Sequence, residues 1–155
     1  METMKKAVIT EQKLHDDNRY PFDSGRAALF SVKIVKGEVT DVIREMEAGD
    51  IYQMLESSTA RKVMKDSKTV MVATCGWAAP IGDDAELDEL APSQHPRRRR
   101  VRLMSLVDSK GVATVLRFKD DPNNIIEDNG AAQGSLAEAL LELREAGKTK
   151  KKGNK

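Results

Sequence analysis

Apolar residues gather in four segments whose spacing is typical of β-strands. Residues 28–35 alternate between apolar and polar side chains, and residues 69–75 form a continuous apolar run, as expected of a strand buried on both faces. Residues 100–107 and 112–118 lie on either side of a short polar turn and predict a β-hairpin. The pattern therefore predicts a small, mostly antiparallel sheet.

Two other stretches show the spacing of amphipathic helices. Apolar residues recur at helical intervals over residues 39–66, where Gly49 separates two helices. For the first part of this stretch the alternative is a β-hairpin over residues 29–43 that turns at residues 36–37. Residues 135–146 begin with a capping box and carry a leucine-rich face. We expect two to three helices packed on one face of the sheet, which is an α+β fold.

The remaining segments lack apolar periodicity. Residues 1–26 are rich in charges and turn-forming residues and predict an irregular N-terminal arm. The single α+β domain is expected to span residues 27–147, interrupted by a proline-rich and acidic loop at residues 81–96 that is either disordered or functional. Residues 148–155 contain no apolar side chain to bury, so we expect a disordered basic tail.

Composition agrees with one soluble domain in the cytoplasm. The chain has 155 residues, of which 39% are hydrophobic and only 4% aromatic, so the core must be mainly aliphatic. No apolar run approaches the roughly 18 residues of a membrane span, and no membrane partner is expected. Cys75 is the single cysteine and cannot form an internal disulfide, which is typical of a cytoplasmic protein.

Positive charge is concentrated in two segments, although the net charge of the chain is only +1. Outside these two segments, acidic residues outnumber basic ones. Guanidinium groups match phosphate oxygens, and a lysine-rich tail attracts polyanions without sequence preference. The first segment holds five arginines, and the second is the lysine tail: Arg97, Arg98, Arg99, Arg100 and Arg102, then Lys148, Lys150, Lys151 and Lys152.

The arginine run predicts a non-enzymatic binding or regulatory module. Its five arginines lie where the loop meets the strand at residues 100–107, so we expect them to engage nucleic acid or another anionic partner such as an acidic protein surface. The alternative is that the acidic residues 83–89 fold back and neutralise the run within the same chain. The oligomeric state and the identity of the partner stay open.

A small enzyme is the second functional hypothesis. Cys75 could act as a nucleophile with His95 as its base, in a pocket at the strand ends that Trp77 also lines. Acidic residues around Asp84 lack the glycine and terminal glutamate of a calcium loop, so no metal is expected. The glycines stand singly and form no phosphate-binding loop, so no cofactor is expected.

Several loop motifs between residues 69 and 146 carry a resemblance. The motifs are Trp77-Ala-Ala-Pro80, Pro92-Ser-Gln-His95-Pro96, Arg98-Arg-Arg100-Val-Arg-Leu103 and Gly134-Ser-Leu-Ala-Glu-Ala139. With them, the sequence resembles small uncharacterised proteins of actinobacteria and their phages. The resemblance implies that the protein is located in a bacterial cytoplasm and is encoded by an accessory phage gene, and it assigns no activity to any residue.

Overall fold

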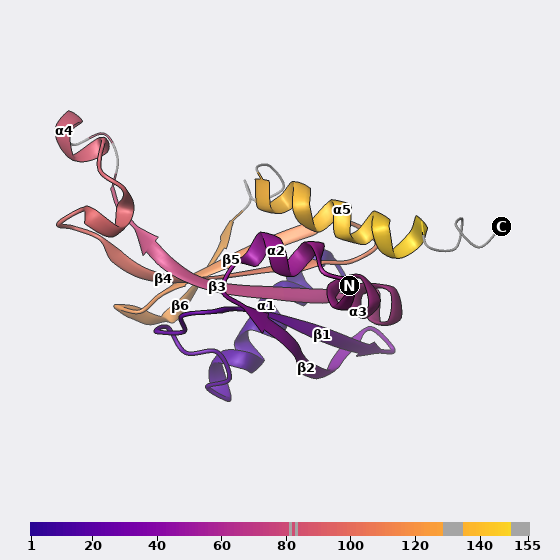
Figure 1. The fold of residues 1–155 in the computed structure, drawn as a ribbon. Helices are drawn as coiled ribbons and strands as arrows, with labels where there is room; N and C mark the ends of the chain where they lie inside the picture. The colour runs from indigo at the N-terminus through magenta and orange to yellow at the C-terminus, as the bar shows by residue number, and fades with distance from the viewer. Residues whose placement is uncertain (81, 83, 129–134, 150–155) are drawn as a thin grey trace.

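An antiparallel sheet forms the centre of the protein. The computed structural model describes residues 1–80, 82, 84–128 and 135–149. Within these residues, six strands pair in the order β2-β1-β3-β4-β5-β6, and every neighbouring pair is antiparallel (Figure 1). The predicted α+β fold is therefore confirmed. The strands are β1 (Ala27–Val35), β2 (Glu38–Ala48), β3 (Val70–Ala78), β4 (Arg99–Val107), β5 (Val112–Phe118) and β6 (Asp121–Asp128).

Helices cover both faces of the sheet (Figure 1). Helix α1 (Thr3–Asp16) packs on one face, where Ala7 and Leu14 join the first hydrophobic core. The opposite face carries α2 (Ile51–Glu56), α3 (Ser58–Ser67) and α5 (Ser135–Thr149), which close a second core. The layers are thus helix, sheet and helices, so the prediction that the helices pack on one face only is wrong: α1, which was not predicted, covers the second face.

Alternation along the central strands supplies both cores. In β1, Phe30 lies in the α1 core and Leu29 lies in the opposite core. In β3, Met71 likewise lies in the α1 core and Val72 lies in the opposite core. A strand that is buried on both faces needs an unbroken apolar run, which explains the sequence of β3.

The β3–β4 connection projects beyond the sheet as an arm (Figure 1). Its described residues form the short helix α4 (Ala85–Asp88) and a turn of 3₁₀ helix, η1 (Pro92–Gln94). Asp84 caps α4 by accepting hydrogen bonds from the backbone N–H groups of Glu86 and Leu87. The segment 81–96 therefore contains local helical structure, although it buries no residue of α4.

The prediction of an irregular arm over residues 1–26 is wrong, because Thr3–Asp16 is helical. The buried face of α1 contains two polar residues, Thr10 and Glu11, between Ala7 and Leu14. Buried polar residues interrupt the apolar stripe by which a helix is recognised. Only the partners of Glu11, which lie far away in the sequence, make its burial favourable.

The predicted helix over the first part of residues 39–66 is also wrong, and the alternative hairpin is confirmed. β1 and β2 turn at Lys36 and Gly37, which adopt φ angles of 53° and 78°. Positive φ at two central residues is the signature of a tight hairpin turn. Two register irregularities in the β1–β2 ladder shift the inward positions of the hairpin, so its apolar residues no longer alternate simply.

β6 was not predicted, since residues 120–133 have the composition of a loop. β6 is an edge strand with mostly exposed residues, including Pro122 and several acids. Charges and proline are common on edge strands because they prevent pairing with other chains. The predicted disordered tail at residues 148–155 lies outside the described residues from position 150 onward.

Candidate functional site

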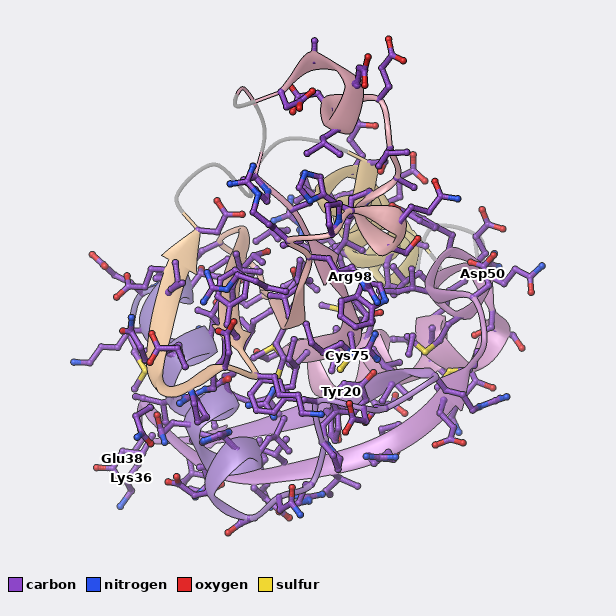
Figure 2. The ribbon with its side chains drawn as sticks, turned by 90° about the vertical axis from the view of Figure 1, so that its left-hand side faces the viewer. Tyr20, Lys36, Glu38, Asp50, Cys75 and Arg98 are labelled. Atoms are coloured by element: carbon purple, nitrogen blue, oxygen red, sulfur yellow. The ribbon has the colours of Figure 1, made fainter. Side chains whose placement is uncertain are left out.

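The arginine run leads into β4 beside the end of β3, next to the base of the arm. Trp77 pairs with Arg100 and Cys75 pairs with Arg102 across the β3–β4 ladder. Figure 2 views the molecule from the side of the arm and labels Arg98 with Cys75 and Tyr20. Because neighbouring residues of a strand point to opposite faces, the arginines of β4 cannot form one continuous surface.

Arg102 is an internal residue. Its side chain is only 2% exposed and donates to Oε2 of Glu11 (3.1 Å), to the Tyr20 carbonyl (2.8 Å) and toward Nδ1 of His15 (2.7 Å). The guanidinium carbon also lies 4.3 Å from the ring centroid of Phe22. Arg102 cannot reach an external ligand in this structure, so its predicted place in a binding surface is wrong.

Arg117 shares Glu11 with Arg102 and was not predicted. It is buried and donates to the two carboxylate oxygens of Glu11 at 2.8 and 2.7 Å. A carboxylate this deeply buried needs paired charges and full hydrogen bonding to be tolerated. The Glu11–Arg102–Arg117 cluster, which we call the buried triad, therefore holds α1 against β4 and β5.

His15 lies at the edge of the buried triad. Burial lowers its pKa, and the guanidiniums of Arg117 and Arg102 lower the pKa further, against smaller opposing effects of Glu11 and Asp16. The neutral imidazole can accept a hydrogen bond through Nδ1 from Arg102. His15 therefore supports the triad in its uncharged form.

Arg99 and Arg100 hold loops of their own chain. Arg99 grips Asp120 through Nε and Nη2 at 2.9 and 2.6 Å, and these hydrogen bonds hold the pKa of Asp120 below its ordinary value. Arg100 donates to the carbonyls of Phe22 (2.8 Å) and Ser24 (3.4 Å). Both arginines thus have structural partners, although Arg99 remains partly exposed.

The described acidic residues of the segment 83–89 form no ion pair with the arginine run. Asp88 accepts from the backbone N–H of Gly82 at 3.1 and 3.0 Å, and no described acid of α4 pairs with an arginine. Asp83 lies outside the described residues, so neutralisation by the whole segment stays a prediction. Arg102 and Arg99 pair with Glu11 and Asp120, which sequence order does not bring near them.

Arg98 remains beside a partly exposed aromatic ring. Its guanidinium carbon lies 5.0 Å from the ring centroid of Trp77, and that of Arg100 lies 5.2 Å from it. The Trp77 residue is 39% exposed. Arg97 is exposed, and its backbone N–H donates to Nδ1 of His95. This end of the sheet is therefore a small basic and aromatic surface.

The geometry around Cys75 does not resemble that of a catalytic cysteine. Burial raises the pKa of the Cys75 thiol, and Arg100 and Arg102 only partly oppose this effect. The thiol donates to the Pro21 carbonyl at 3.5 Å, and within the described chain no hydrogen bond joins it to His95. A catalytic thiol needs a lowered pKa and a base within reach, and Cys75 shows neither.

A second basic surface lies on α3 and α5, and we call it the α3–α5 basic surface. Of its six cations only Lys148, in the basic tail, was singled out in the sequence, although four of the others recur at helical spacing on α3 and at its end. A groove of about 510 Å³ between α2–α3 and α5 borders Arg61 and Lys62, together with Glu56 and Glu142. The surface consists of Arg61, Lys62, Lys65, Lys68, Arg144 and Lys148.

A cavity of about 310 Å³ adjoins this groove at the ends of α3 and α5. Among the residues that the structure describes, four cations and no carboxylate line it. Gly147 of α5 lies against the end of α3, where a Cβ atom built on it would be in ordinary van der Waals contact with the backbone nitrogen of Lys65 at 3.5 Å. The lining residues are Met64, Lys65, Lys68, Ser109, Arg144, Gly147 and Lys148.

Comparisons with known proteins add no assignment to this geometry. No described helix combines the length and apolar character needed to cross a bilayer. In the described part of the chain, no three His, Cys, Asp or Glu side chains gather as a metal site would require. No protein-family model matches the sequence, and neither curated proteins nor solved structures give a significant match.

Proposed function

We propose that the protein is a non-enzymatic binding module for nucleic acid and that it contacts the sugar-phosphate backbone through the α3–α5 basic surface. The observation that carries the proposal is the cavity lined by four cations and no carboxylate, on a chain with a net charge of only +1. A local excess of positive charge on a nearly neutral protein favours polyanions at that place. Lys150, Lys151 and Lys152 follow Lys148 in the sequence and lie outside the described residues.

The geometry of α3 suits a phosphate backbone better than a single acidic group. The cations from Arg61 to Lys68 span about 10 Å along the helix axis at 1.5 Å per residue. Duplex DNA presents one negative charge about every 1.7 Å of its axis, so several phosphates face that length. Exposed lysines act as point charges and read no base edges, so we expect binding without sequence preference.

The arginine end of the sheet has a smaller part in this proposal. Arg99 and Arg102 pair with carboxylates, and Arg100 donates to backbone carbonyls. Arg98 is therefore the contact offered there, because it lies over the Trp77 ring and, among the described residues, its side chain donates only one hydrogen bond, to the His95 carbonyl. Trp77 provides a partly exposed ring on which an unpaired base can stack. We therefore expect this end to contribute to single-stranded ligands more than to duplexes.

Fluorescence anisotropy with labelled single-stranded and duplex oligonucleotides, over a salt series from 50 to 200 mM, tests the proposal. The Lys62→Gln/Lys65→Gln/Lys68→Gln variant removes three cations of the α3–α5 basic surface. Each lost duplex phosphate contact should reduce the slope of log affinity against log salt by about 0.9, so the slope should fall by about 2.7. Arg98→Gln tests the other end in the same assay.

A matched control removes three exposed lysines elsewhere. Lys5 and Lys13 lie on α1 and Lys33 lies on β1, so their replacement by Gln makes the same change in net charge away from the proposed surface. We expect the control to bind nearly as the native protein does. Equal loss in the control and in the α3 variant would contradict a defined surface. Binding to an acidic polypeptide but not to nucleic acid would replace the proposed partner class.

A further inference from the structure

The cavity at the ends of α3 and α5 carries more positive charge than the neighbouring negative groups neutralise. Lys65 and Lys68 form no ion pair with any residue that the structure describes. Arg144 donates through Nη1 to the Asp108 carbonyl (3.4 Å), and its buried Nε atom lies 3.4 Å from Oε1 of Glu145 without the geometry of a hydrogen bond. A buried guanidinium N–H that lacks a well-aligned acceptor is costly, and a bound anion would supply one.

The negative groups nearby offset only part of this charge. Glu145 lies 3.6 Å from Nζ of Lys148 and 3.4 Å from Nε of Arg144 at the rim. The carboxylate of Asp108 is already paired with Lys6 at 2.7 Å. The C-terminal ends of α3 and α5 add about half a negative charge each. After these contributions, the four cations leave a surplus of about two positive charges.

We propose that this cavity binds the dianion of a phosphate monoester, which in a nucleic acid is a terminal phosphate. The inference rests on the proposed function for its source of ligand. A phosphate monoester carries about −1.5 to −2 charges near pH 7, which matches the surplus. An internal phosphodiester carries one charge and continues the chain on both sides, so a strand end enters a cavity more readily.

The size of the cavity agrees with such a ligand. A volume of about 310 Å³ corresponds to roughly ten water molecules at about 30 Å³ each. This space holds a phosphate group and part of the sugar that carries it. The aliphatic stems of Lys65 and Lys68, together with Met64, give the sugar an apolar wall.

Anisotropy with one oligonucleotide in 5′-phosphorylated, 3′-phosphorylated and unphosphorylated forms tests the inference. We expect a terminal phosphate to improve affinity about tenfold, as two or three partly buried ion pairs provide. The Lys65→Gln/Lys68→Gln variant should lose this advantage and keep binding to the remaining surface. The advantage should also shrink from pH 7.5 to 5.5, because the second pKa of the phosphate is about 6.

Glu145→Gln provides a variant that cannot act by unfolding the protein. It frees Arg144 and Lys148 from their rim carboxylate, so affinity for the phosphorylated strand should rise about threefold. Affinity for the unphosphorylated strand should change less, because the carboxylate lies beside the cavity. A loss of affinity in this variant would overturn the assignment of the cavity.

Small probes separate this inference from the proposed function. Phenyl phosphate and the monoanion phenyl sulfate are titrated while the amide resonances of Lys65 and Lys68 are followed by NMR. Saturable shifts with phenyl phosphate alone support the cavity even if no oligonucleotide binds, and they identify a free phosphate monoester as the ligand. Equal affinity for phosphorylated and unphosphorylated strands overturns the inference and leaves the proposed function standing. No response to any probe overturns both.

Discussion

Glu11→Gln is expected to destabilise the protein more than most single substitutions, because it removes the carboxylate of the buried triad. Glu11 is 1% exposed and pairs with Arg102 and Arg117, whose side chains are both 2% exposed. The substitution keeps the side-chain shape but leaves two buried cations without a counter-charge. Breaking a buried ion pair by removing one partner typically costs about 3–5 kcal/mol.

The partners that Arg102 and Arg117 keep determine how much folding free energy the substitution costs. Arg102 keeps the Tyr20 carbonyl and Arg117 keeps the Pro122 carbonyl, so each guanidinium retains a hydrogen bond but not a charge partner. We therefore expect a loss of about 3 kcal/mol, at the lower end of the range. For a domain of this size each kcal/mol lowers Tm by about 2–4 °C, so Tm should fall by about 6–12 °C.

Urea denaturation followed by circular dichroism measures this change as a shift in midpoint at constant slope. Asp16→Asn is the matched control, since it removes an exposed carboxylate from the same helix, and we expect a change below about 0.5 kcal/mol. The variant Glu11→Leu/Arg102→Met/Arg117→Met should recover most of the stability, because no buried charge is left unpaired. A Glu11→Gln protein within 1 kcal/mol of the native one would refute the reasoning.

Two further predictions concern titrating groups. Because burial raises the pKa of Cys75, its alkylation rate should stay low at neutral pH and rise only at a pH above the ordinary thiol pKa. His95→Ala should not change this pH profile. A fast reaction at pH 7 that depends on His95 would restore the enzyme hypothesis. The pKa of His15 is lowered in the folded state, so the unfolded chain binds the proton more readily, and folding stability should fall as pH drops below about 6.5, the unfolded value. Denaturation midpoints of the native protein and of His15→Gln between pH 7.5 and 5 measure this effect, and the variant should lose that part of the pH dependence.

The strands that were predicted correctly have patterns determined by local burial. The first half of β3, Val70–Ala73, is apolar because both of its faces are covered, and the β4–β5 hairpin joins two apolar segments through a short turn. α1 was not predicted, and β2 was predicted only as an alternative to a helix, for different reasons. The buried face of α1 contains Glu11, and the register irregularities of the β1–β2 ladder give β2 a spacing that resembles a helix.

The functional surfaces depend on packing that no local pattern contains. Glu11 lies 91 residues from Arg102 and 106 residues from Arg117 in the sequence, so the internal use of Arg102 could not be inferred from the arginine run. The spacing of Lys62, Lys65 and Lys68 was visible in the sequence. That α5 brings two more cations beside them follows only from the contact at Gly147.

The long separation within the buried triad has a consequence for how the chain folds. The β1–β2 hairpin connects neighbouring residues and can form as soon as it is synthesised, whereas α1 must wait until β5 has been made. Until then Glu11 lacks at least one of its two arginine partners, and the sheet surface that α1 will cover stays open to water. We expect the first helix of the chain to be among the last elements to dock.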